Sequence, residues 1–152
     1  MRVRFQVEGY SASNVRAVLT ESISSPEITI QSPLEVRITP STNRVDLGGS
    51  FRVSVDVRNT TTRRIDGITL DPALLETTGT GRLKYRSGPT PPIPASLAAS
   101  AHQLVTFEFE GSGPGAATLA TTARGRVTGG AAVASLKTVS ERVIVGITGD
   151  LL

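Results

Sequence analysis

The sequence predicts an all-β protein in which two antiparallel sheets pack face to face. Apolar and polar residues alternate along several runs of six to eight residues, which is the pattern of strands that bury one face. Turn residues, chiefly glycine, proline and aspartate, separate these runs. No window of the chain shows the sustained spacing of a helix. Short strands divided by turns are typical of a sandwich or barrel rather than of a parallel sheet covered by helices.

The clearest strand is expected at residues 51–58, where every odd position is apolar and every even position is polar. The same alternation, in a clear or in a weaker alanine- and threonine-rich form, marks residues 3–8, 34–39, 105–110, 115–123 and 139–147. Residues 72–76 would form at most one helical turn.

Connections are expected where glycine and proline gather. Residues 111–115 form a tight connection in which glycine permits positive φ, and Gly129-Gly130 marks a hairpin tip or a loop. Residues 87–95 contain four prolines and therefore cannot form a central strand. We expect a polyproline-II spacer there. The alternative is a PxxP ligand, Pro89 to Pro92, for an aromatic groove.

Composition limits the classes of function. At 152 residues the chain is one domain, or one domain with an appendage. It has no cysteine, which excludes disulfides and thiolate metal sites. The net charge is +3, but the arginines are dispersed among apolar residues, as on the solvated face of a sheet, so no nucleic-acid partner is predicted. No apolar run suits a signal peptide or a membrane span. We therefore expect either a mature or excised fragment or a protein that does not use the secretory route, such as a phage component, and no membrane insertion.

No constellation of residues points to catalysis. His102 is the only histidine, and no nucleophile-elbow motif or glycine-rich oxyanion loop accompanies it. The aspartates near strand ends are too scattered for the 6–8 oxygen ligands of calcium. We therefore expect no catalytic residue, no metal site, no cofactor and no small-molecule substrate, and the sequence predicts that the protein is not an enzyme.

The loop after the clearest strand is the most polar of the chain. It begins with a glycosylation sequon, Asn59-Thr60-Thr61, which we expect to be exposed, and it carries the pair Arg63-Arg64. Sandwich modules place recognition on their end loops. The candidate loop contacts are therefore Asn59, Arg63 and Arg64.

The order of signals from residue 34 onward matches a known group of domains. A strand of the form Phe51-Arg52-Val53-Ser54-Val55-Asp56-Val57-Arg58-Asn59 follows a glycine turn, and a Gly-Pro-Gly turn leads to an alanine- and threonine-rich strand pair. In this respect residues 34–146 resemble the bacterial immunoglobulin-like repeats of cell-surface and adhesin-type proteins. The resemblance implies an immunoglobulin-like antiparallel β-sandwich over residues 34–152, protein partners, and an extracellular or cell-surface location. It brings no catalytic residues.

Residues 1–33 form an additional N-terminal β segment. The run from Val3 to Gly9 matches the run from Val105 to Gly111 in valine, phenylalanine, glutamate and glycine, as a partial internal repeat would. Its apolar face, formed by Val3, Phe5 and Val7, requires a cover. The chain would then be a cut from a tandem array, or the segment would fold onto the main sandwich, or it would complete the sheet of a neighbouring subunit as a partner-contacting arm.

Two functions fit these observations. The first is a non-catalytic structural or adhesive module of a bacterial surface protein, which works through protein–protein contacts with copies of itself or neighbouring subunits. The alternative is a phage virion protein, a decoration, cement or tail-associated immunoglobulin-like subunit on the virion exterior, which assembles through its N-terminal β arm.

The strand-donating arm predicts a difference in size between the full chain and a chain that begins at Ser32. By light scattering with size-exclusion chromatography, the full chain would form oligomers and the shortened chain would be a stable monomer, because the donated strand is missing. Two monomers of similar stability would contradict the arm.

Overall fold

The computed structural model describes residues 9–10, 16–17 and 32–147. The chain divides into two compact units, residues 1–31 and residues 32–152. In the first unit, β1 (Gly9–Tyr10) pairs antiparallel with β2 (Arg16–Ala17).

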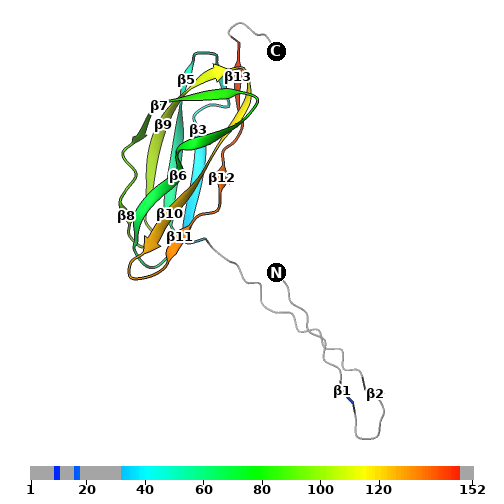
Figure 1. Ribbon diagram of the computed structural model, residues 1–152, viewed down its shortest axis with the longest axis vertical. Coiled ribbons are helices and arrows are strands. Elements are labelled where there is room, and N and C mark those ends of the chain that lie inside the picture. The colour runs from blue at the N-terminus through cyan, green and yellow to red at the C-terminus, as the bar shows by residue number, and fades with distance from the viewer. Residues whose placement is uncertain (1–8, 11–15, 18–31, 148–152) are drawn as a thin grey trace. The chain divides into compact units, whose positions relative to one another are not determined.

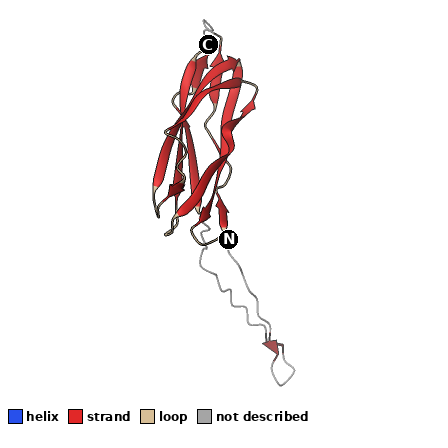
Figure 2. Ribbon diagram, turned by 60° about the vertical axis from the view of Figure 1, so that its left-hand side comes forward, coloured by secondary structure: helices blue, strands red, loops and turns tan. Residues whose placement is uncertain are grey.

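The second unit consists of two sheets (Figures 1 and 2). The first sheet contains, in spatial order, β3 (Leu34–Pro40), β5 (Ser50–Asn59), β9 (His102–Gly113) and β7 (Arg82–Thr90). The second contains β4 (Arg44–Asp46), β13 (Val143–Gly146), β10 (Gly115–Val127), β6 (Ile65–Gly79) and β8 (Ser96–Leu97). Two short strands also pair with β10, namely β11 (Ala132–Ala134) and β12 (Thr138–Val139).

The strand order identifies the sandwich as immunoglobulin-like. In an immunoglobulin constant-type domain, strands A, B, E and D form one sheet and C, F and G the other. Taken in chain order, β3, β5, β6, β7, β9, β10 and β13 occupy the places of strands A to G. All pairs are antiparallel except the one between β4 and β13. The predicted fold class is therefore confirmed.

The alternation of the strands forms the core. Every odd position of β5 from Phe51 to Val57 points inward, and its even neighbours face outward. Phe107 and Phe109 of β9 pack from the same sheet, opposite Leu119 of the second sheet. Each large apolar side chain that is fully buried contributes about 1.5–3 kcal/mol. Since the chain has no cysteine, no disulfide assists this packing in holding the two sheets together.

Residues 72–76, which were predicted to form at most a helical turn, instead belong to β6. Of these residues only Glu76 has a partner on β10, which is Ala120. Because the next pair joins Thr122 to Asp71, residues 72–75 form a bulge without ladder partners. At this irregularity Leu75 adopts a positive φ of 59° and is 5% exposed, whereas Leu74 points outward and is 51% exposed. The bulge thus buries Leu75 in place of Leu74, which strict alternation from the buried Leu70 would have turned inward.

The proline-rich segment is partly a strand. β7 continues to Thr90, within the stretch predicted to be a spacer, and it lies at the edge of the first sheet. An edge strand tolerates proline because one of its sides forms no ladder. The same strand contains Tyr85, whose ring packs edge-on against Phe109 at a centroid distance of 6.1 Å.

The core packing predicts a large difference between two substitutions on β9. Phe107→Ala removes a fully buried ring and should lower the free energy of unfolding by about 3–5 kcal/mol. Leu104→Ala, at a side chain that is 50% exposed, should change it by about 0.5 kcal/mol or less. Urea unfolding measures both values, and equal losses would contradict the described core.

Candidate functional site

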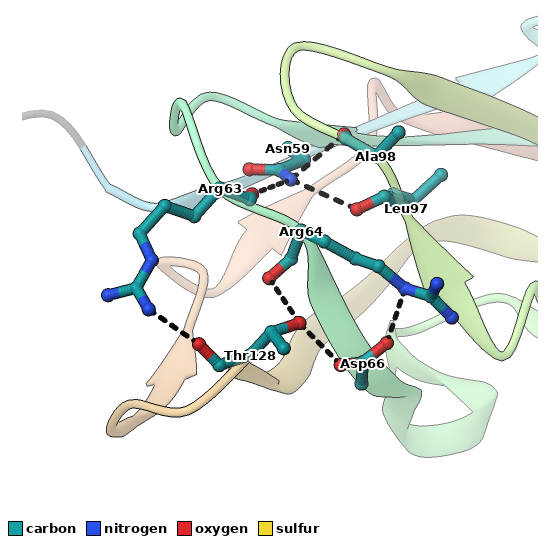
Figure 3. Close-up of polar contacts among 7 residues, drawn as sticks. All are labelled: Asn59, Arg63, Arg64, Asp66, Leu97, Ala98 and Thr128. Carbon is teal, nitrogen blue, oxygen red and sulfur yellow. Dashed lines mark hydrogen bonds and ion pairs between the residues drawn. The ribbon is translucent and has the colours of Figure 1, made fainter.

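Asn59 holds the loop between β5 and β6 (Figure 3). Its side chain is 0% exposed, and Nδ2 donates hydrogen bonds to the carbonyl oxygens of Arg63 at 2.7 Å, Leu97 at 3.1 Å and Ala98 at 3.0 Å. Its Oδ1 accepts from the backbone N–H and the hydroxyl of Thr61, at 2.9 and 2.8 Å. Asn59 was predicted as a loop contact, and this is wrong, because every polar atom of the side chain is used inside the fold.

The glycosylation sequon was also expected to be exposed, and it is not. The amide nitrogen that would receive a glycan is the buried Nδ2 of Asn59. The reason lies in the alternation of β5, because position 59 continues the odd, inward-facing series that begins at Phe51. In the folded chain this asparagine is not a modification site.

Arg63 and Arg64 are exposed, and both are tethered to nearby groups (Figure 3). Arg63 Nη2 donates to the carbonyl oxygen of Thr128 at 2.7 Å, and Arg64 Nε donates to Asp66 Oδ1 at 2.7 Å. The hydroxyl of Thr128 donates to Asp66 Oδ2 at 2.6 Å. This hydrogen bond, together with Arg64, holds the pKa of Asp66 below its usual value, although desolvation opposes them. The loop is therefore connected to the turn after β10 through Thr128 and Asp66. Because its pKa is lowered, the carboxyl of Asp66 stays ionised to a lower pH than an ordinary aspartate.

Val3, Phe5 and Val7, the predicted partner-contacting arm, lie outside the described residues. Their role stays a prediction.

The outer face of the first sheet carries groups of alternating charge. Arg52 lies opposite Glu108, and Arg37 lies opposite Asp56, whose Oδ1 is 2.9 Å from Nδ1 of His102. Within the described ranges no hydroxyl bonds to this imidazole, and no three histidine, aspartate or glutamate side chains gather as metal ligands. An open depression of about 540 Å³ on this face is lined mainly by hydroxyls, among them Ser54 and Thr106.

In the part of the chain that the structure describes, no helix could span a bilayer.

Exposed aliphatic side chains lie along one edge of the second sheet. None of them is among the site residues predicted from the sequence. We call residues 132–147, which contain β11, β12 and β13, the edge run. Of the seven large apolar side chains that are exposed in the described residues, four belong to the edge run: Leu136 at 79%, Val139 at 56%, Ile144 at 37% and Ile147 at 57%. A fifth, Leu47, is joined to it through its N–H, which donates to the carbonyl of Gly146 at 2.7 Å.

Two serines divide the edge run into short strands. The N–H of Ser135 donates to the carbonyl of Ala123 at 2.8 Å, while its Oγ accepts from the Ala123 N–H at 2.8 Å. Ser140 forms the same pair of bonds with Leu119 of β10, at 2.7 and 2.9 Å. At both places a side-chain oxygen takes the role of a ladder carbonyl. The serines are five residues apart and their partners four, so the stretch between them carries one extra residue, which is a bulge. A second residue is gained between β12 and β13, because Val139 pairs with Ala120 and Val143 with Ala117.

These irregularities change what the edge can bind. β11 and β12 pair only with β10, and β4 covers only β13, so the margin beside β11 and β12 has no further strand among the described residues. At this margin β12 lies next to β3 of the other sheet (Figure 1). Short, bulged edges are poor templates for an added strand. A partner therefore meets side chains here rather than a continuous ladder.

Comparisons with known proteins add little to this description. No protein-family model matches the sequence, and no curated protein matches it. Among solved structures, the chain is similar to the ASH / PapD-like domain 7 of human CEP192, with 11% identity and a TM-score of 0.48, over 87% of this chain and 99% of that one. It is also similar to a GH20 exo-β-N-acetylglucosaminidase of Vibrio harveyi, with 13% identity and a TM-score of 0.39, over 79% of this chain and 19% of that one. The immunoglobulin-like assignment therefore rests on the strand order.

Because Asn59 is buried and bonded inside the fold, its replacement should lower the stability of the protein without changing its exposed surface. Asn59→Ala removes the donor to three carbonyl oxygens and should lower the free energy of unfolding by about 2–3 kcal/mol, because the carbonyls lose their partners in a buried site. Thr62→Ala, at an exposed position of the same loop, should change it by less than about 0.5 kcal/mol. Urea unfolding of both variants is the measurement, and an unaffected Asn59→Ala would refute the structural role.

Proposed function

We propose that this chain is a non-catalytic structural module of a bacterial surface protein, and that it works through contacts with protein partners, in particular with copies of itself. The extracellular setting follows the resemblance of residues 34–146 to surface-protein repeats. The observation that supports the contact is the row of exposed aliphatic side chains on the edge run.

The local geometry makes these side chains accessible. Ile144 points outward because its neighbours Val143 and Val145 point into the core. Ala116 of β10 lies opposite Ile144, and Ala120 lies opposite Val139. Because alanine is small, the aliphatic groups of the edge run are not covered from the adjacent strand. Covering them would gain about 25 cal/mol for each Å² of apolar surface removed from water.

A second copy is a suitable partner for such a surface. An apolar surface is complementary to itself, and a two-fold axis brings the same patch of both subunits into contact. The bulged edge at Ser135 and Ser140 disfavours a continuous β-sheet that would extend across the two copies. The interface would therefore consist of packed side chains rather than of backbone ladder bonds.

Self-association of the full chain should depend on the edge run. We expect sedimentation to show a concentration-dependent dimer, and Val139→Asp should weaken it about tenfold or more, because the interface would then bury an unpaired charge. Leu104→Asp is the matched control, since Leu104 is similarly exposed, 50% against 56%, on the other sheet. It should leave the dimer unchanged.

A full chain that stays monomeric at every concentration would overturn this proposal, as would equal weakening by the two substitutions. The chain that begins at Ser32 separates the edge run from the arm. If that chain still associates, the contact belongs to the edge run.

A further inference from the structure

Four arginines gather at one end of the second sheet, although they come from two distant places in the sequence. Arg63 and Arg64 are the last two residues of the loop before β6, and Arg124 and Arg126 lie on β10. Arg126 is directly opposite Asp66, the aspartate that Arg64 binds. Arg63 reaches the carbonyl of Thr128, two residues beyond Arg126. We call these four residues the arginine surface.

The neighbours of Arg124 and Arg126 are small, so both guanidinium groups are open to solvent. On one side β11 places Ala134 opposite Arg124 and Ala132 opposite Arg126. On the other side β6 places Thr69 opposite Arg124, and Gly67 follows Asp66. A shallow depression of about 410 Å³ lies here, lined by Asp66, Gly67, Arg124, Gly125 and Arg126.

The carboxylates of this region do not neutralise Arg126. Asp66 accepts from Thr128 Oγ1 at 2.6 Å and from Arg64 Nε at 2.7 Å. Asp71 accepts from Arg124, whose Nε and Nη2 both lie 3.0 Å from Oδ2. Within the described residues Arg126 has no hydrogen bond or ion pair, although a carboxylate lies on the opposite strand. Four arginines against two aspartates leave two positive charges in excess.

On the outer face of the first sheet most arginines have a carboxylate beside them, including Arg86, which forms an ion pair with Glu110, whereas Arg82 lies opposite Gly113. Arg37 lies opposite Asp56, and Arg52 lies opposite Glu108. Arg58 lies opposite Glu35. The dispersed arginines of the sequence therefore behave as a solvated face on the first sheet, while the two close pairs form a positive region on the second.

We propose that the arginine surface binds an acidic segment of a partner protein, with carboxylates of that segment on Arg126 and on the free edge of Arg124. The guanidinium group of Arg126 presents a planar set of donors that matches a carboxylate in two places. This contact uses charged side chains and not the apolar side chains of the edge run, so the inference goes beyond the proposed self-association.

A protein segment fits better than a nucleic acid. Nucleic-acid interfaces are large and strongly positive, and single strands stack their bases on aromatic side chains. The four aromatic residues between residues 32 and 147, Phe51, Tyr85, Phe107 and Phe109, all belong to the first sheet. Asp66 and Asp71 would repel a continuous phosphate backbone, whereas discrete carboxylates of a peptide can avoid them.

The test uses the full chain and a fluorescein-labelled peptide of alternating glutamate and alanine, followed by fluorescence anisotropy. We expect binding that weakens as the salt concentration rises from about 0.05 M to about 0.5 M. Arg126→Glu should lower the affinity about tenfold, because an attraction becomes a repulsion. Arg142→Glu, the same change at an exposed arginine of the connection before β13, should leave it unchanged.

Absence of peptide binding would overturn the proposal, and so would an equal loss in the two variants. A single-stranded oligonucleotide of the same charge that binds more tightly than the peptide would overturn it in favour of a nucleic-acid site. Sedimentation of Arg126→Glu separates the two proposals, since its self-association should equal that of the unchanged chain.

Discussion

The period-two alternation of apolar side chains between the two sheets is the constraint on which the rest of this molecule depends. Without disulfides, the sheets stay together because the inward residues of β5 and β9 pack against those of β10 and β13. A strand cannot turn one residue inward without turning its neighbours outward. The same rule that buries Val57 also buries Asn59, and an asparagine in that position must satisfy its polar atoms internally.

The edges of the sandwich show how this constraint shapes the surface. Along the edge run the ladder to β10 is kept in place by Ser135 and Ser140, which add a residue without losing the buried valines of β13. The bulge discourages strand addition, yet the outward positions still carry leucine, valine and isoleucine. We interpret this combination as an edge that resists uncontrolled sheet growth while it keeps an apolar contact surface. The arginine surface lies on the same sheet and supplies the complementary, charge-selective contact.

The local pattern of the sequence predicted the strands well and their partners poorly. Residues 34–39, 51–58 and 105–110 are strands as expected, and Gly129 lies in the hairpin between β10 and β11. The bulge at Leu75 was missed because its cause, the register with β10, joins residues 44 to 51 positions apart, Glu76 with Ala120 and Asp71 with Thr122. For the same reason the sequence could not show that Arg126 lies on the strand opposite Asp66, the aspartate that Arg64 binds. The burial of Asn59 was readable from its odd position in β5 and was overlooked because asparagine ordinarily marks an exposed turn.

The most direct test of the contact surface is a photo-crosslinking measurement on the full chain, with benzoylphenylalanine placed at Val139 or at Leu104. Both positions are exposed, on the second and the first sheet respectively. The account predicts that illumination of the Val139 position yields a covalent dimer, and that mass spectrometry maps the link to the edge run of the other chain. The Leu104 position should yield monomer. A dimer of equal yield from both positions, or none from Val139, would contradict the account.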